Sequence, residues 1–361
     1  MSKQTPLHHI HKGLGAKLIP FAGYDMPVRY ISDKQEHIAV RNGAGMFDVS
    51  HMGEFIVRGP KALELIQKVT SNDASKLPEG KAQYSCLPRP EGGIVDDLIV
   101  YHIRDDQYML VVNASNIEKD WEWISEHNTM GAELIDVSEK TSLLAVSGPK
   151  AEAVLQKLTD FDLSQLKTYE CWKGTFNGAE KSLIATTGYT GERTFEVFLW
   201  SQHAERIWHD IIDAGQEFGL IPTGLGSRDT LRLEMGYMLY GNDINDTTST
   251  LEAGLGWITK LKKGDFVGRD FLLQQKEEGI KRKLIGFKME GRGIPRSGYP
   301  IAIDGQEVGQ VTSGSISPMM GYGIGMGYVP TEHATIGGQL DIMIRGKAVA
   351  AEIVKTPFLQ R

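Results

Sequence analysis

Two adjacent aspartates, Asp96 and Asp97, lie inside residues 92–102, a stretch that is otherwise mostly apolar. Residues 94–102 are rich in β-branched side chains, which is typical of a half-buried strand. Successive strand residues point to opposite faces, so only one of the two carboxylates can face a given cavity. A carboxylate among apolar neighbours costs free energy unless a polar group meets it. The pattern indicates either a fixed carboxylate that faces a polar ligand or a solvated turn with two exposed aspartates.

Two later segments carry further candidate groups. Glu196 lies in an apolar strand after a glycine-marked turn at residues 187–191, and alternation puts it on the face opposite Phe195. Arg228 and Arg232 are four residues apart and share one face of a predicted helix. A guanidinium fork there could bind a carboxylate or a heterocycle. The alternative interpretations are a solvated glutamate and surface ion pairs with neighbouring acids.

The composition is that of an ordinary globular protein. The 361 residues are 41% hydrophobic and 24% charged, enough for two or three domains with sizeable cores. The net charge of −7 argues against a general nucleic-acid binder. No apolar run approaches the roughly 20 residues of a membrane span, and the N-terminus lacks the apolar core of a signal peptide. We therefore expect neither nucleic acid nor a membrane as a partner.

The two cysteines, Cys86 and Cys171, are far apart and form no CxxC pair. Structural zinc and a disulfide framework are therefore not expected, and reduced cysteines fit a cytoplasmic location best. The motifs of P-loop NTPases, HExxH zinc peptidases and GxSxG serine hydrolases do not occur in the sequence. We expect no bound metal.

An internal repeat must position the candidate groups. The sequence Gly-Pro-Lys-Ala opens a helical run at residues 59–62 and again at residues 148–151, each time after an apolar strand. Further strands and a second helix follow in both copies. Two such units, at about 55–130 and 143–215, predict duplicated ferredoxin-like α+β layers, each an antiparallel sheet with helices on one face. The seam between such units is a common ligand site.

Other elements have simpler signals. Ser32 has the side chain of a helix N-cap and predicts a helix that continues to Arg41. Residues 255–261 are predicted to form a short strand. From Lys283 onward, short β-type runs alternate with glycine and proline turns, which predicts a separate β-barrel or sandwich. These runs are residues 284–289, 299–303, 307–312, 325–329, 339–344 and 348–354.

Four motifs together resemble the aminomethyltransferase family of the glycine cleavage system, the T-proteins. They occur in order at residues 46–52, 92–100, 188–192 and 226–234, and the likeness spans nearly the whole chain. The resemblance implies an α+β, cloverleaf-like three-domain arrangement. Residues 1–275 would form the folate-binding region, built of two discontinuous α+β domains, and residues 283–361 a C-terminal β domain.

The resemblance also implies a reaction. Members of this family act on the aminomethyl group carried by the lipoyl arm of H-protein and transfer its one-carbon unit to tetrahydrofolate. The products are ammonia, 5,10-methylenetetrahydrofolate and dihydrolipoyl H-protein. Tetrahydrofolate is therefore the implied cosubstrate and lipoylated H-protein the implied protein partner.

The family's site residues map onto this sequence one by one. The second aspartate of the Gly-Gly-Ile-x-Asp-Asp motif is Asp97, which the resemblance implies to be the catalytic group that approaches the folate. Glu196 and Arg228 match the acid after the turn and the first arginine of the helix motif. Our hypothesis is that Asp97 holds a folate N–H and stabilises developing positive charge, while Glu196 accepts from the aminopyrimidine edge. The other folate-lining positions are Met52, Tyr84, Tyr101 and Tyr189.

Rival assignments come from related folate-binding proteins. The folate-binding halves of sarcosine- and dimethylglycine-oxidising enzymes accompany a flavin domain, and no dinucleotide fingerprint occurs here. A non-enzymatic folate-binding iron–sulfur maintenance protein of related fold would carry a cysteine in a Lys-Gly-Cys-Tyr-x-Gly turn, but the turn at residues 187–191 has none. A pure binding module would follow if Asp97 pointed away from the cavity.

Overall fold

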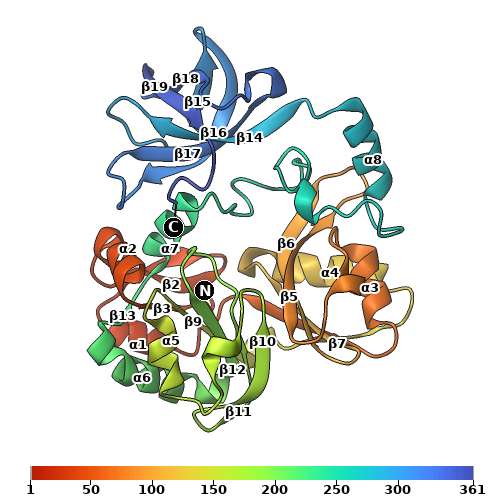
Figure 1. Ribbon diagram of the computed structural model, residues 1–361, viewed down its shortest axis with the longest axis vertical. Coiled ribbons are helices and arrows are strands. Elements are labelled where there is room, and N and C mark those ends of the chain that lie inside the picture. The colour runs from red at the N-terminus through yellow and green to blue at the C-terminus, as the bar shows by residue number, and fades with distance from the viewer. Residues whose placement is uncertain (1, 361) are drawn as a thin grey trace. The chain divides into compact units, whose positions relative to one another are not determined.

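The computed structural model describes residues 2–360, which fall into two compact units. The first unit comprises the described residues up to 69, together with 73–85 and 97–229, and the second comprises 70–72, 86–96 and the described residues from 230 onward. Each unit has its own hydrophobic core. Figure 1 gives the order of the elements by colour and label.

The first unit begins with a short helix, a hairpin and a second helix that precedes the first long sheet. Ser32 caps the second helix as predicted, because its hydroxyl accepts a hydrogen bond of 3.2 Å from the Gln35 N–H. These elements are α1 (His8–Gly13), β1 (Lys17–Phe21), β2 (Tyr24–Arg29), α2 (Asp33–Asn42) and β3 (Gly45–Asp48).

The first repeat is a five-stranded sheet in the order β5-β6-β7-β4-β8 with helices on one face. The ring of Phe55 on β4 contacts Trp121 of α4 at a centroid distance of 5.3 Å, which marks the face that the helices cover. The elements in chain order are β4 (Gly53–Arg58), α3 (Ala62–Val69), β5 (Lys81–Pro88), β6 (Ile94–Arg104), β7 (Gln107–Val112), α4 (Ile117–His127) and β8 (Glu133–Asp136).

The second repeat has the same order of strands and helices, with β3 added to its sheet, so the order is β10-β11-β12-β9-β3-β13. Trp208 of α6 is fully buried in a core with Phe195 and Val197 of β12. The predicted duplication is confirmed, and each copy closes with one further short strand. The elements are β9 (Thr141–Ser147), α5 (Ala151–Gln156), β10 (Cys171–Phe176), β11 (Ala179–Ala185), β12 (Thr194–Trp200), α6 (Ala204–Gly215) and β13 (Ile221–Pro222).

The second unit contains a closed six-stranded barrel in the order β14-β17-β16-β15-β18-β19. Each predicted run from residue 284 onward coincides with one of its strands, so the predicted C-terminal β structure is confirmed. The strands are β14 (Arg282–Met289), β15 (Pro300–Ile303), β16 (Gln306–Ile316), β17 (Gly323–Pro330), β18 (Gln339–Ile344) and β19 (Lys347–Val354).

Two helices and several short 3₁₀ segments complete the chain. Helix α7 (Leu225–Glu234) has its first half in the first unit, and α8 (Arg269–Glu278) lies in the second. The predicted strand at residues 255–261 is wrong, because this segment contains a 3₁₀ turn with Trp257 62% exposed. The 3₁₀ segments are Ala74–Lys76, Ala114–Asn116, Ser138–Lys140, Leu163–Gln165, Ser201–His203, Gln216–Phe218, Gly256–Ile258 and Thr331–His333.

Candidate active site

The two sheets of the first unit turn their helix-free faces toward each other. On β4, Phe55 faces the helices, so Glu54 points to the other side. The register pairs Glu54 with Val111 and Val111 with Ile99, so that face also carries the neighbouring odd-numbered positions of β6, including Asp97 and Tyr101.

On the second sheet, Phe195 and Val197 enter the core beneath the helices, so Glu196 and Phe198 project from the opposite face. Tyr101 joins the two faces, since its ring meets Phe198 edge-on at a centroid distance of 5.6 Å. The seam predicted from the repeat is therefore an interface between two sheets within one unit.

Asp97 is held on this interface by one side chain from β5 and one from the residue that follows β7. The phenol of Tyr84 on β5 donates a hydrogen bond of 2.8 Å to Oδ2 of Asp97. The side-chain amide of Asn113 donates to Oδ1 at 2.8 Å and to the Asp97 carbonyl oxygen at 3.1 Å. The carboxylate is half-buried. Of the two interpretations of this motif, the contacts of Asp97 agree with a fixed carboxylate and not with a solvated turn.

Asn113 was missed by sequence reasoning, although the hairpin contains its signal. Leu98 pairs with Val112 in the antiparallel register of β6 and β7, which brings the residue before Leu98 opposite the residue after Val112. A polar residue just beyond the end of an apolar strand is common, so only the register identifies this one.

Tyr101 and Glu196 meet across the interface. The fully buried Tyr101 hydroxyl lies 3.2 Å from Oε2 of Glu196 and 2.7 Å from the Thr187 hydroxyl, which also donates to Glu196. Burial raises the pKa of Glu196, opposed by the Thr187 hydrogen bond and the positive charge of Arg228. Burial, reinforced by the Glu196 charge, holds the pKa of Tyr101 well above its usual range, so its phenol remains a donor.

Arg228 and Tyr189 form a second pair. The guanidinium carbon of Arg228 lies 4.5 Å from the centroid of the Tyr189 ring, within the range of a cation–π contact. Burial and the nearby charge of Arg228 lower the pKa of His51 to about 4, with Asp48 opposing them, so His51 is neutral at pH 7.

Two buried charges that sequence reasoning missed hold the segments carrying this pair. Arg41 of α2 donates from Nη1 to the Thr190 carbonyl at 2.6 Å and to Glu192 at 2.8 Å, which fixes the turn around Tyr189. The carboxylate of Glu36 accepts from the Gly224 N–H at 2.8 Å, directly before α7. The sequence signals only an amphipathic helix at this point, because Thr190, Glu192 and Gly224 are more than a hundred residues away.

Six of the seven predicted site residues thus form three pairwise contacts in the first unit, which are Tyr84 with Asp97, Tyr101 with Glu196, and Tyr189 with Arg228. The seventh, Met52, is half-buried in the turn before β4. Its backbone N–H donates to the Val49 carbonyl at 3.1 Å.

Glu54 is an acidic residue on the same interface that sequence reasoning did not select. The residue is 1% exposed, and neither of its carboxylate oxygens has a hydrogen-bond partner among residues 2–360. Burial raises its pKa well above the usual range, and the negative charges of Asp136 and Glu196 add to the effect. The carboxyl is therefore held toward its neutral form.

Replacing Glu54 by Gln is expected to stabilise the protein increasingly as the pH rises. The raised folded-state pKa means that the wild-type contribution is fully present below the ordinary glutamate pKa and is lost as the pH rises through the folded-state pKa. Each unit of pKa difference corresponds to about 1.4 kcal/mol. Urea unfolding at pH 5, 7 and 8.5 measures the effect, with the exposed Glu126→Gln as control. Parallel stability curves for wild type and Glu54→Gln would contradict the expectation.

Two family models match this chain almost end to end. The GCVT N-terminal domain matches residues 7–263, and the glycine cleavage T-protein C-terminal barrel domain matches residues 282–360. The chain belongs to the glycine cleavage T-protein family. The aminomethyltransferase of Flavobacterium psychrophilum is 56% identical over 99% of this chain and 100% of the relative. That of Halothermothrix orenii is 51% identical over 99% of this chain and 100% of the relative.

A solved structure agrees with the fold of this T-protein. The crystal structure of glycine cleavage system aminomethyltransferase T from Bartonella henselae superposes with a TM-score of 0.94 at 33% sequence identity. The superposition covers 99% of this chain and 98% of that chain. The predicted fold class and the predicted family are confirmed, and this T-protein is an enzyme of the transferase class. Over residues 2–360, no helix is both long and apolar enough to span a membrane.

Proposed function

We propose that this T-protein transfers the one-carbon unit of an aminomethyl group, carried on the lipoyl arm of H-protein, to tetrahydrofolate. The products are 5,10-methylenetetrahydrofolate, ammonia and dihydrolipoyl H-protein. The observation that carries the proposal is Asp97, a carboxylate fixed by Tyr84 and Asn113 on the interface that also presents Tyr101 and Glu196. We place the reaction in the cytoplasm, since Cys86 and Cys171 are both free and buried.

The chemistry of the lining fits a reduced folate. Its pterin is flat, and its aminopyrimidine edge offers N–H donors, for which Glu196 is an acceptor held among aromatic rings. Arg228 offers donors to the acceptor side of the ring system. Tyr101 and Tyr189 supply aromatic surface. The apolar and polar groups therefore match both the faces and the edges of the proposed cosubstrate.

Asp97 supplies electrostatics at the reacting nitrogen. As the carbon–sulfur bond to the lipoyl arm breaks, positive charge develops on the aminomethyl carbon and then on the folate amine that attacks it. A carboxylate already fixed by Tyr84 and Asn113 stabilises that charge without reorganising. Orienting the two reactants can contribute up to roughly 7–11 kcal/mol in favourable cases.

The direct test is ammonia release from aminomethylated H-protein with and without tetrahydrofolate. The proposal requires ammonia release to depend on tetrahydrofolate and one methylenetetrahydrofolate to form per ammonia. Tetrahydrofolate binding without any product would instead identify a binding module.

Tyr84→Phe is expected to lower turnover about two- to tenfold, the equivalent of roughly 0.5–1.5 kcal/mol for one hydrogen bond. The phenol hydroxyl that holds Oδ2 of Asp97 at 2.8 Å is lost, whereas the ring and the Asn113 bond remain. Steady-state assays at saturating tetrahydrofolate measure the change, with the exposed Tyr322→Phe, in the loop before β17, as the matched control. An equal loss of turnover in both variants would contradict a role for the Tyr84 hydroxyl in the site.

A further inference from the structure

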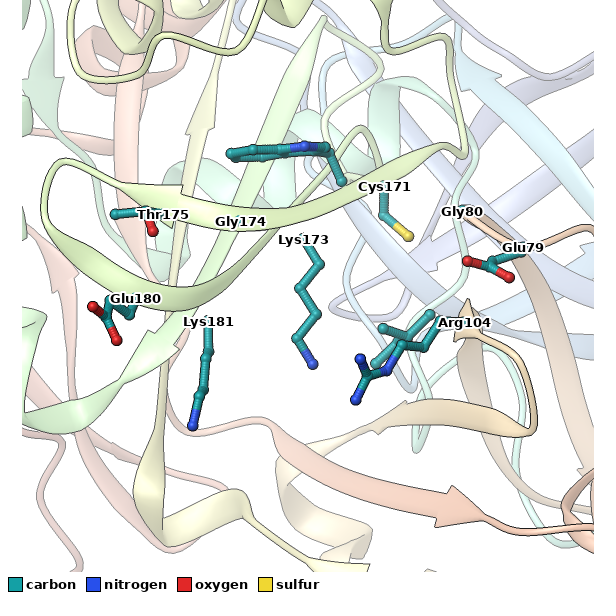
Figure 2. Close-up of a pocket in the computed structure, with 11 residues that line it drawn as sticks. Glu79, Gly80, Arg104, Cys171, Lys173, Gly174, Thr175, Glu180 and Lys181 are labelled. Atoms are coloured by element: carbon teal, nitrogen blue, oxygen red, sulfur yellow. The ribbon is translucent and has the colours of Figure 1, made fainter.

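A cavity of about 700 Å³ lies in the first unit, beyond the end of β6 that is distant from Asp97. Ile103 and Arg104 form one wall, and the β10–β11 hairpin with Lys173 and Lys181 forms another (Figure 2). None of the seven predicted site residues lines it. We call this cavity the basic cleft.

The basic cleft gathers three cations from two sheets. Figure 2 shows the side chains of Arg104, Lys173 and Lys181 extending into a common space, whereas Glu180 is directed away from Lys173. Within the described part of the chain, none of the three cations has a carboxylate within 4.0 Å. Glu79, the other acid on the lining, accepts a hydrogen bond of 3.2 Å from the Asp105 N–H.

The positive charges act on one another. Partial desolvation lowers the pKa of Lys173, which stays exposed to solvent, and the charges of Arg104 and Lys181 lower it further. Like charges that face one space repel one another, and an anion bound between them would remove that repulsion. The whole chain carries a net charge of −7, so a local excess of positive charge is unusual for it.

The backbone of the hairpin is shaped around these side chains. The register of β10 and β11 shifts between Gly174 and Phe176, so that Thr175 lies opposite both Glu180 and Lys181, which is a β-bulge on β11 beside the turn. Lys181 itself, within the bulge, has a φ of +60°, a conformation that non-glycine residues seldom adopt. Bulges and strained residues of this kind concentrate at binding sites, where they redirect side chains.

The hairpin is also held firmly from its other side. The Trp172 ring stacks on Phe161 at a centroid distance of 4.4 Å and an interplanar angle of 13°. A Cβ on Gly174 would come within 2.1 Å of the Trp172 ring, so only glycine allows the ring this position. The two lysines are thus carried on a fixed scaffold, which lowers the entropy that a ligand must remove on binding.

We propose that the basic cleft is a second ligand site that binds a small polyanion, a molecule with two or more carboxylates or phosphates, through Arg104, Lys173 and Lys181. The site is separate from the aminomethyl-transfer site. Tyr101 is two residues before Ile103 on β6, so the two sites share one strand. Small polycarboxylates and small polyphosphates have the same recognition chemistry, and the experiment distinguishes them.

Isothermal titration calorimetry with two probes, γ-linked triglutamate and inorganic tripolyphosphate, tests the proposal. We expect saturable 1:1 binding of at least one probe at 50 mM salt and weaker binding at 200 mM salt. The double variant Lys173→Gln/Lys181→Gln should lose at least about tenfold in affinity, because both charge-assisted contacts from the hairpin are removed. Glu180→Gln should leave binding equal or tighter.

The matched control is Lys12→Gln/Lys17→Gln, which removes the same charge from exposed positions of the first unit. Binding lost equally in both double variants, or no saturable binding of either probe, would overturn the proposal. Which probe binds more tightly identifies the source of the anion. The experiment measures binding and not turnover, so its result is independent of whether the transfer reaction proposed above is correct.

Discussion

Asp97→Asn is expected to reduce turnover by about 10²- to 10³-fold while the affinity for tetrahydrofolate changes little. Asparagine keeps the size of the side chain and its oxygen can still accept from Tyr84 at one position, so the interface remains filled. The amide lacks the negative charge that we propose stabilises the cationic carbon and the attacking amine. The loss therefore falls on the transition state and not on the bound ground state.

Single-turnover ammonia release and equilibrium tetrahydrofolate binding, measured on the same preparation, separate the two effects. Asp106→Asn is the matched control, because Asp106 is exposed at the tip of the same β6–β7 hairpin. Near wild-type turnover in Asp97→Asn would refute the proposed role of this carboxylate. Turnover and affinity lost together would instead make Asp97 a folate-positioning group.

Glu196→Gln is expected to weaken tetrahydrofolate binding about tenfold or more, with turnover at saturating folate largely retained. One charge-assisted hydrogen bond to the aminopyrimidine edge becomes a neutral one. The NH₂ group of the Gln amide is itself a donor, so it cannot accept from the N–H groups of the ligand. The folded-state pKa of Glu196 is raised by burial, so its ionised form increases as the pH rises through that value. Wild-type affinity should therefore increase with pH, whereas that of Glu196→Gln should not.

Fluorescence titration of tetrahydrofolate between pH 5 and pH 8 provides the comparison, with the exposed Glu205→Gln as control. A dissociation constant for Glu196→Gln equal to that of wild type at pH 8 would exclude the proposed contact. Opposite profiles for the two acids, turnover lost in Asp97→Asn and affinity lost in Glu196→Gln, would assign the two carboxylates to different parts of the same ligand.

Local patterns predicted much of this fold because the relevant physics is local. The alternation of apolar residues and the position of glycines located the barrel strands, such as β18 (Gln339–Ile344), and the Gly-Pro openings revealed the duplication. Strand alternation also separated Glu196 from its neighbour Phe195. Residues 255–261 were mispredicted because an apolar composition without a clear period does not distinguish a strand from a 3₁₀ turn.

The partners of the site residues lie on segments that are distant in the sequence, and local sequence patterns do not predict such contacts. Arg41 reaches Glu192 across 151 positions, and no pattern within α2 distinguishes it from a solvated arginine. Glu54 has the period of an ordinary half-exposed strand residue, whereas in the folded chain it is 1% exposed. Family resemblance supplied the candidate positions of Tyr84 and Tyr189, but their contacts follow from the packing.

The duplication has a consequence for how a ligand can enter. Asp97 lies on the third strand of the first copy, β6, whereas Glu196 lies on the fourth strand of the second copy, β12. The position in the second copy that corresponds to Asp97 is therefore on β11, and neither acid is the twin of the other. In the proposed binding mode, a ligand between the copies would meet Asp97 at one end and Glu196 at the other. The reversed orientation would place its N–H donors away from Glu196 and should bind more weakly.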